Sequence, residues 1–218
     1  MRRGIDICVA ALVLPLLFPL FALISLAIIV DSPGNPFHGG WRAGKDARRF
    51  RMWKFRTMVM NADRQGSAIT APSDPRITRV GWLLRKTKLD ELPQFFNLLL
   101  GDLTLVGPRP EDPGITDGYT TEQRQVLKVK PGITGPTQLH YTVLEAEAIP
   151  DGSDAQRFYI DHILDQKVRL DLEYLSKRTL MSDLHVVVQT ALLMAESLLR
   201  TEPRRAQRVP AIPPDPSL

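Results

Sequence analysis

A long apolar segment opens the chain. Residues 7–30 carry no charged side chain and lie between Asp6 and Asp31. As a helix, such a segment is long enough to cross a bilayer core of about 30 Å. Pro15 and Pro19 interrupt it near the middle, and each proline removes a backbone hydrogen-bond donor and crowds the preceding turn. The pattern therefore predicts a membrane-embedded helix that breaks at the two prolines.

Basic residues on both sides of this segment favour a re-entrant topology. Lys and Arg concentrate on the cytoplasmic side of membrane segments. Here they precede the segment as Arg2 and Arg3 and follow it as Arg42, Lys45, Arg48, Arg49, Arg51, Lys54 and Arg56. Both ends are therefore expected on the cytoplasmic side, which a helix–break–helix hairpin allows. The alternatives are a plain transmembrane helix and a signal peptide, and the prolines disfavour the signal peptide.

The middle of the chain predicts short helices and strands. A helix is expected to begin at Asp90, with Asp90 near its N-cap and Pro93 in its first turn, because proline is tolerated only where its missing N–H has no partner anyway. Residues 50–58 suit either a short strand or the entry of a helix. Residues 103–106 are strand-like, and Pro131–Pro136 suits a turn. The fold class expected is α+β and mainly helical.

The C-terminal part is mostly helical from residue 154 to residue 200, with a predicted N-cap at Ser182. Residues 184–199 are rich in apolar side chains, so this stretch could lie on a membrane or pack in a core. Residues 201–218 contain several prolines and arginines and are expected to be disordered.

Composition indicates one compact domain with appendages. The chain has 218 residues, 44% of them hydrophobic, which is ample for a core. The expected units are a membrane hairpin over 1–31, a domain over 32–200 and a tail over 201–218. Cys8 is the single cysteine, so no intrachain disulfide can form. The four histidines show no metal-ligand spacing, and a zinc site is not expected.

Positive charge is concentrated in one region. The net charge is +4, but the stretch Arg42–Lys88 alone holds thirteen Lys or Arg residues against three Asp and no Glu. Such a region requires an anionic partner. Nucleic acid, an acidic membrane surface and a nucleotide-sugar diphosphate would each satisfy it, so charge leaves these classes open.

Adjacent carboxylates mark the strongest candidate site. Asp90 and Glu91 follow Arg85, Lys86 and Lys88 and precede the rigid Pro108-Arg109-Pro110. An isolated Asp-Glu pair most often caps a helix and interacts with its dipole. A carboxylate that attacks a phosphoryl group, however, needs nearby cations to offset the negative charge of that group, and this segment supplies them.

The segment KLDELPQFFNLLLGDLTLVGPRP, residues 88–110, resembles the catalytic segment of the monotopic phosphoglycosyl transferases. These bacterial sugar transferases start glycan assembly on polyprenyl phosphate. The resemblance runs from Arg2 to about Thr190 and includes Lys54-Phe55-Arg56-Thr57-Met58 and Pro131-Gly132-Ile133-Thr134. Members of the family dip into one leaflet through a helix broken at a Ser-Pro pair, and the corresponding pair here is Phe18-Pro19.

The resemblance implies an activity. A sugar-1-phosphate would pass from a UDP-sugar to polyprenyl (undecaprenyl) phosphate with release of UMP, as the first membrane step of a surface glycan or exopolysaccharide pathway. The enzyme would sit in the bacterial inner membrane, with a small catalytic domain and interfacial helices on the cytosolic face. Its partners would be the two substrates and membrane lipid, without nucleic acid. The sugar and the oligomeric state, a homo-oligomer included, stay open.

The resemblance also implies roles for individual residues. Asp90 would be the nucleophile that forms a covalent phosphosugar intermediate, and Glu91 would help to hold Mg²⁺, which prefers oxygen ligands. Pro108, Arg109 and Pro110 would border the nucleotide. The phosphate-binding cations would be Lys54, Arg56, Arg85 and Arg109.

Two rival functions remain open to comparison. A membrane-tethered nucleic-acid-binding or regulatory protein would use the basic region without catalysis, but its aromatic residues are not interleaved with the cations as stacking platforms would be. An ATP-dependent kinase would require a P-loop or a kinase glycine-rich loop, and the sequence contains neither.

Overall fold

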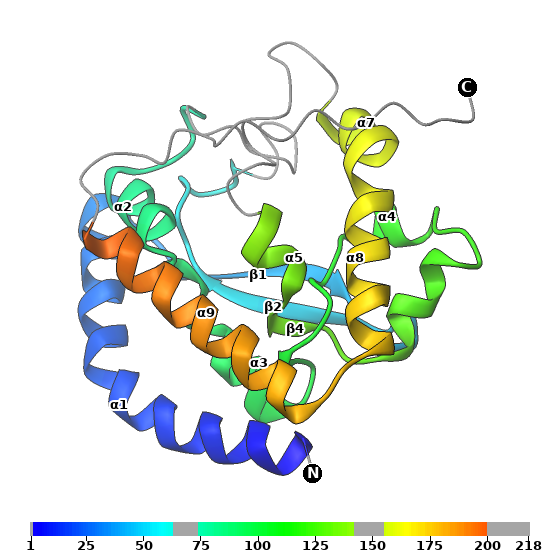
Figure 1. Ribbon diagram of the computed structural model, residues 1–218. Helices are drawn as coiled ribbons and strands as arrows, with labels where there is room; N and C mark the ends of the chain where they lie inside the picture. Colours follow the sequence, from blue (N-terminus) through cyan, green and yellow to red (C-terminus); the bar gives the residue numbers. More distant parts are fainter. Residues whose placement is uncertain (1, 63–73, 142–154, 200–218) are drawn as a thin grey trace.

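The computed structural model describes residues 2–62, 74–141 and 155–199. The predicted tail over 201–218 and most of the predicted loop over 61–75 lie outside these residues. Helices wrap two small sheets (Figure 1), as expected for a mainly helical α+β fold. The helices are α1 (Arg2–Asp31), α2 (Arg79–Thr87), α3 (Gln94–Leu100), α4 (Pro113–Thr116), α5 (Pro136–Tyr141), α7 (Ala155–Phe158), α8 (Leu164–Ser176) and α9 (Leu180–Leu199).

Shorter helical turns and four strands complete the described chain. The 3₁₀ turns are η1 (Lys45–Ala47), η3 (Leu89–Glu91) and η4 (Gln123–Lys128), and η5 (Tyr159–Ile163) is a π-helical turn. The strands are β1 (Phe37–Ala43), β2 (Arg49–Phe55), β3 (Thr104–Val106) and β4 (Gly132–Thr134).

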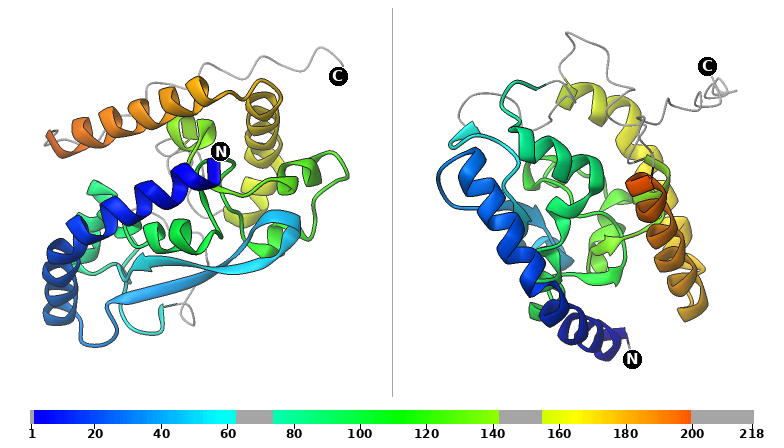
Figure 2. Two further views of the ribbon diagram at one scale, coloured as in Figure 1. Left: turned by 90° about the horizontal axis from the view of Figure 1, so that it is seen from below. Right: turned by 90° about the vertical axis from the view of Figure 1, so that its left-hand side faces the viewer.

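The first helix, α1, is continuous but bent near its middle (Figures 1 and 2). Pro15 and Pro19 lie inside it, and a proline within a helix removes a hydrogen bond and bends the axis. The predicted break is therefore corrected to a bend. Among the described residues, α1 is the one helix that is long and apolar enough to cross a membrane, by length and composition.

One side of α1 packs on the domain, and the other side is exposed and apolar. Phe21, Ile24 and Ile28 form a core with Phe55 of β2 and Leu84 of α2. Large apolar side chains on the rest of the helix are exposed, among them Leu12, Leu16, Phe18, Leu23, Leu26 and Val30. An apolar surface of this size on a helix indicates contact with lipid or with another protein.

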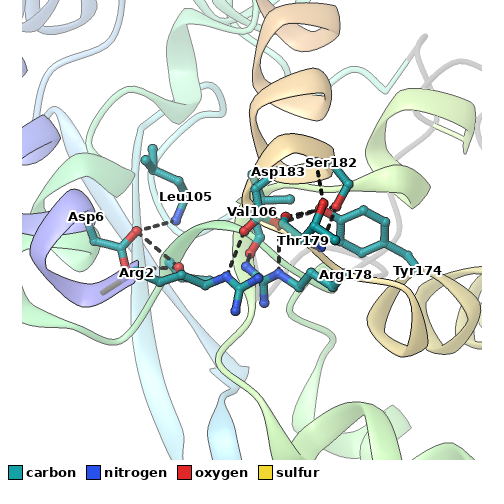
Figure 3. Close-up of polar contacts among 10 residues, drawn as sticks. Arg2, Asp6, Leu105, Val106, Tyr174, Arg178, Thr179, Ser182 and Asp183 are labelled. Carbon is teal, nitrogen blue, oxygen red and sulfur yellow. Dashed lines mark hydrogen bonds and ion pairs between the residues drawn. The ribbon is translucent and has the colours of Figure 1, made fainter.

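The first turns of α1 are anchored to the domain by charged side chains (Figure 3). Buried Asp6 accepts hydrogen bonds from Oγ1 of Thr104 at 2.9 Å and from the backbone N–H of Leu105 at 3.0 Å. Arg2 donates to Asp183 of α9 at 2.8 Å, and the same carboxylate pairs with Arg178 at 2.8 Å. The beginning of α1 is thus held against β3 and α9.

The two sheets place the segments that frame the candidate site. Strands β1 and β2 form an antiparallel hairpin with Phe37 opposite Phe55 and Ala43 opposite Arg49, so residues 50–58 begin as a strand and not as a helix entry. Strands β3 and β4 pair in parallel, which corrects the predicted turn over Pro131–Pro136. Gly132 permits this pairing, because a Cβ there would lie 2.2 Å from the backbone nitrogen of Gly107.

Helix α9 begins earlier than predicted and has two faces. Its cap is Thr179, whose hydroxyl accepts from the N–H of Ser182 at 3.0 Å while the Ser182 hydroxyl accepts from the N–H of Thr179 at 2.9 Å, so Ser182 is not the N-cap. Val186 is buried, and the hydroxyls of Thr190 and Thr134 lie 2.6 Å apart. The other face exposes Met181, Leu184, Val188 and Leu192. One face of the helix therefore packs against the domain, as the core alternative predicts, whereas a membrane location of the exposed apolar face stays a prediction.

The hairpin β1–β2 and helix α9 lie on opposite sides of the molecule in the left view of Figure 2, with α3 and the first half of α1 between them. The segment that carries Asp90 and Glu91 joins α2 to α3. This segment contacts α2 and β2, and α3, which follows it, contacts both β2 and α1.

Candidate active site

Asp90 and Glu91 lie on the 3₁₀ turn η3, which follows α2 after a single left-handed residue. Lys88 ends α2 with φ of 59° and ψ of 13°, and this reversal starts the new turn. Asp90 makes no capping hydrogen bond, and Pro93 rather than Asp90 stands at the N-cap of α3. The predicted capping position of Asp90 is therefore wrong. Its carboxylate is buried but accepts no hydrogen bond from the N-terminal backbone of the helix.

The carboxylate of Asp90 has an unused acceptor in a buried position. The residue is 7% exposed, and within the described part of the chain its Oδ1 has no hydrogen-bond partner. Burial raises the pKa of Asp90 above its usual value, and the charge of Glu91 acts in the same direction, whereas Lys54, Lys88 and Arg85 oppose the rise. A buried polar atom without a partner costs free energy, so such an atom calls for a functional explanation.

Glu91 is the opposite case, because cations contact it directly. Nζ of Lys54 lies 2.8 Å from its Oε1, and a terminal nitrogen of Arg109 lies 3.6 Å from the same oxygen. Burial alone would raise the pKa of Glu91, but Lys54, Arg109 and Lys88 outweigh it and hold that pKa well below its ordinary range. Two adjacent carboxyls thus have environments that push their pKa values apart, a pattern typical of catalytic pairs.

Arg85 supplies a further cation next to Asp90. Its Nε donates to Oγ1 of Thr57 at 2.8 Å, which fixes the guanidinium at the end of the β2 segment. Burial lowers the pKa of Arg85, and the charge of Asp90 partly restores it. The guanidinium keeps its charge in any case. Lys86 instead lies 5.1 Å from the ring centroid of Trp82 in a cation–π contact.

The structure brings together most of the residues singled out from the sequence. Lys54 of β2 and Arg109 of the segment after β3 contact the carboxylate of Glu91, and the charge of Arg85 of α2 acts on the pKa of Asp90. Lys88 joins them as a residue that had been noted only as part of the basic run. Burial lowers its pKa, and Glu91 counteracts that effect. The sequence feature that could have indicated a role for Lys88 is its position two residues before Asp90.

Arg56 lies elsewhere. Its guanidinium donates to the backbone carbonyls of Ser32 and Pro33, in the turn that follows α1. The side chain is buried, and burial lowers its pKa. Because β2 ends at Phe55, Arg56 does not continue the alternation that would place it beside Lys54. Its position does not support the predicted phosphate-binding role.

This arrangement predicts that Arg56 stabilises the fold. Arg56→Ala should lower the free energy of unfolding by about 2 kcal/mol, since the partly buried carbonyls of Ser32 and Pro33 lose a charged donor whose side chain is itself buried. Thermal unfolding in detergent would measure the change, with exposed Arg51→Ala as the control. Turnover per folded molecule should stay within a few-fold of the wild type. The phosphate-binding role would instead be restored if Arg56→Ala were stable and lost as much activity as a Lys54→Ala variant measured beside it.

Asn97 is a site-forming residue that the sequence analysis missed. It is fully buried in α3; its Oδ1 accepts from the N–H of Trp53 at 2.9 Å, and its Nδ2 donates to the carbonyl of Arg51 at 2.7 Å. These bonds tie α3 to the strand that carries Lys54, and so hold Lys54 in register with Glu91. The sequence feature that could have indicated it is the position of a polar amide inside the apolar run 95–100.

The segment Pro108-Arg109-Pro110 follows β3 and lines a small cavity together with Glu111 and Tyr119. The cavity volume of about 20 Å³ has room for about one water molecule, far less than a nucleotide requires. This cavity therefore cannot hold a nucleotide. The nucleotide-binding role of the three residues stays a prediction.

Mg²⁺ is compatible with the donor set. It is usually held by one or two carboxylates together with substrate phosphates. The anionic Glu91 could supply one such carboxylate. Among the described residues, no group of three or more His, Cys, Asp or Glu side chains could hold a metal by itself. Any ion here would thus depend on ligands from the substrate.

Comparison with known proteins identifies the family. The family model described as bacterial sugar transferase matches residues 1–197. The chain is 36% identical over 194 residues to UDP-N-acetylgalactosamine-undecaprenyl-phosphate N-acetylgalactosaminephosphotransferase of Aeromonas hydrophila, covering 87% of this chain and 42% of that protein. It is 36% identical over 198 residues to UDP-glucose:undecaprenyl-phosphate glucose-1-phosphate transferase of Escherichia coli (strain K12). The match covers 87% of this chain and 39% of that protein.

A third relative is covered more fully. The UDP-glucose:undecaprenyl-phosphate glucose-1-phosphate transferase of Caulobacter vibrioides is 33% identical over 204 residues, which cover 92% of this chain and 70% of that protein. The chain spans about two-fifths of the length of the Aeromonas and Escherichia relatives. None of these matches supports the nucleic-acid-binding alternative. With the family match over nearly its whole length and the acidic pair among cations, the chain belongs to the bacterial sugar transferase family.

Proposed function

We propose that the chain transfers a sugar-1-phosphate from a UDP-sugar to polyprenyl phosphate and releases UMP. The observation that carries this proposal is the buried carboxylate of Asp90, whose Oδ1 has no partner among the described residues and whose pKa is acted on by the charges of Lys54, Arg85 and Lys88. A carboxylate kept from hydrogen bonds is available to attack, and the cations offset the charge of an incoming diphosphate. The relatives' names supply the substrate classes.

The first step would form a covalent intermediate. An Asp90 oxygen attacks the phosphorus next to the sugar, a P–O bond to that carboxylate forms, and the bond to UMP breaks with its electron pair on the UMP phosphate. In the second step an oxygen of the lipid phosphate attacks the same phosphorus and the Asp90 carboxylate leaves. The raised pKa of Asp90 favours a more basic and thus more nucleophilic carboxylate.

Other residues would bind and orient the diphosphate. Arg109 and Lys54 meet at Glu91, and Arg85 is fixed by Thr57, so their charges are positioned before substrate arrives. Arg109 is suited to a phosphate because its guanidinium presents a rigid fork of donors. Glu91 would hold Mg²⁺ together with phosphate oxygens, and the ion would supply charge neutralisation.

The anchored start of α1 supports a re-entrant topology on the cytosolic face of the inner membrane. Arg2 and Asp6 bond to Asp183 and Thr104 of the domain (Figure 3), and Asp31 at the other end accepts the N–H of Val80 at 2.9 Å, so both ends of α1 are attached to the domain. The bend at Pro15 and Pro19 allows the middle of the helix to enter the lipid while both ends stay outside. Exposed apolar residues of α1 and α9 would contact lipid.

Release of UMP tests the proposed function. The protein in detergent or nanodiscs would be given undecaprenyl phosphate and, one at a time, a panel of UDP-sugars, and UMP would be quantified. We expect UMP to be released with at least one UDP-sugar, and no release when the protein is omitted. Absence of UMP with every donor, from a folded and monodisperse protein, would contradict the proposal.

The topology gives a separate prediction. In a background without Cys8, cysteines at Gly4 and Lys45 should both be shielded from a membrane-impermeant reagent in intact cells and both react after lysis. Gly4 suits this substitution because a Cβ there meets nothing within 4 Å, and Lys45 is exposed. Periplasmic labelling of position 4 alone would establish a true transmembrane span and contradict the re-entrant topology.

A further inference from the structure

A buried lysine on α8 is not used by the proposed chemistry. Lys167 is 4% exposed, and its Nζ lies 3.1 Å from Oε1 of Glu111 and 2.7 Å from the hydroxyl oxygen of Tyr159. The Tyr159 hydroxyl in turn donates to the same oxygen of Glu111. The three side chains therefore bond to one another in a closed group, although Glu111 lies far from the other two in the sequence. We call this group the Glu111 cluster.

The π-helical turn η5 brings Tyr159 and Lys167 onto one face. It lies between α7 and α8, and the N–H of Leu164 donates to the carbonyl of Tyr159, five residues earlier. On a regular α-helix of 3.6 residues per turn, two residues eight positions apart point about 80° away from each other. A π turn takes up one additional residue, which reduces this angle to about 20°. Because π turns occur frequently at functional sites, η5 favours a role for the Glu111 cluster beyond filling the core.

Stability alone does not explain a buried ion pair at this place. Burial by itself would raise the pKa of Glu111, but Lys167 and Tyr159 outweigh it and hold that pKa below its ordinary value, so the carboxylate stays charged. Replacing a buried ion pair by apolar residues is often neutral or stabilising. Leu164 and Val168, next to Lys167 on the helix, already belong to an apolar core, so an apolar side chain would suit position 167. The charges are therefore expected to serve the position of Glu111.

The Glu111 cluster holds one end of the short segment that carries Arg109. Arg109 lies between two prolines, whose rings fix their own φ angles and restrict the residue before them. On one side of it, the carbonyl of Pro108 accepts from the N–H of Gly132 at 2.9 Å. On the other side, Glu111 is held by its side chain in the cluster and by its carbonyl, which accepts from the N–H of Ala43 at 2.9 Å. The backbone is thereby fixed on both sides of Arg109.

We propose that Lys167 and Tyr159 are positioning residues for Arg109. They hold Glu111 in place, and the rigid connection through a single proline passes this constraint to Arg109. A terminal nitrogen of Arg109 is thereby kept 3.6 Å from Oε1 of Glu91, in the arrangement proposed to bind phosphate. Neither Lys167 nor Tyr159 touches the substrate. For its effect on turnover this inference rests on the proposed function, but its effect on the backbone at Glu111 does not.

Hydrogen exchange tests the effect of the Glu111 cluster on the backbone without any assay of activity. Lys167→Met removes the ammonium group and keeps an unbranched side chain. The amide of Ala43, which donates to the carbonyl of Glu111, should then exchange about tenfold faster, while peptides of α1 should be unchanged. Lys177→Met is the matched control, because it makes the same change at the end of α8 in a side chain that is 75% exposed. Unchanged exchange at Ala43 in Lys167→Met, or equal acceleration in both variants, would overturn the proposal.

A double-mutant cycle tests whether Lys167 acts through Arg109. Lys167→Met should lower kcat/KM for the UDP-sugar about tenfold in the wild type but less than about twofold in Arg109→Ala, because the positioned group is already gone. Tyr159→Phe, which removes one hydroxyl, should cause a smaller loss with the same dependence on Arg109. Equal losses in both backgrounds would overturn the proposal, even with UMP release intact.

Two further outcomes are also decided by these measurements. If Lys167→Met does not fold, Tyr159→Phe takes its place in the exchange experiment and in the cycle, with the same criteria. If the wild type releases no UMP, the proposed function fails, and exchange at Ala43 still decides whether the Glu111 cluster fixes the backbone beside Arg109.

Discussion

Asp90→Asn is expected to abolish UMP release while leaving the protein folded. Asparagine has nearly the size of aspartate, but its amide is not a nucleophile toward phosphorus, so turnover should fall by about 10⁴-fold or more. Because Asp90 makes no capping bond and its Oδ1 has no partner among the described residues, no stabilising contact of that oxygen is lost. The melting temperature should therefore be unchanged or higher. Steady-state UMP release and thermal unfolding on one preparation would measure both.

Glu91→Gln is the matched comparison for that prediction. It should weaken turnover less than Asp90→Asn, and excess Mg²⁺ should partly restore it, since coordination and not the nucleophile is affected. Added metal should not restore Asp90→Asn. If Asp90→Asn kept near-normal UMP release, the nucleophile would have to be another residue.

Arg109→Ala should produce the second largest loss. Removing a positioned donor from developing charge typically costs about 10²- to 10³-fold in rate, so kcat/KM should fall by that factor. Arg109→Lys should recover little, because an ammonium cannot present the same fork of donors. The measurement is UMP release over a range of UDP-sugar concentrations.

Arg42→Ala is the control for Arg109→Ala. Arg42 forms a partly exposed ion pair with Asp112 at 3.3 Å, and such surface pairs contribute about 0–1 kcal/mol. It removes one positive charge without touching Glu91. Equal losses of kcat/KM in Arg42→Ala and Arg109→Ala would contradict a specific role of Arg109. They would indicate that the site needs only a generally basic surface.

The sequence predicts the long apolar helix and the charged segment around Asp90 because each depends on local pattern, whereas for residues 50–58 the same pattern suits both a strand and a helix entry. It placed Asp90 at a helix N-cap because Pro93 suits a first turn. The left-handed Lys88 adds a 3₁₀ turn and moves the cap to Pro93. The left-handed conformation is unusual for lysine, and the pattern of apolar residues does not indicate it.

Other features depend on contacts between distant segments, and no local pattern contains them. Arg56 lies two residues after Lys54, which suggests a shared face, but the strand ends between them and Arg56 turns to Ser32 and Pro33. Strand β4 was interpreted as a turn because its partner, β3, lies about 28 residues earlier and the pairing depends on Gly132.

The covalent intermediate on Asp90 is the central claim, and intact-protein mass spectrometry tests it most directly. The protein would be incubated with a UDP-sugar that supports UMP release, without polyprenyl phosphate, and its mass measured. We expect the wild-type mass to increase by one sugar phosphate and to return to its original value when polyprenyl phosphate is added, and we expect no increase in Asp90→Asn. The same adduct on Asp90→Asn, or transfer without any adduct on the wild type, would contradict it.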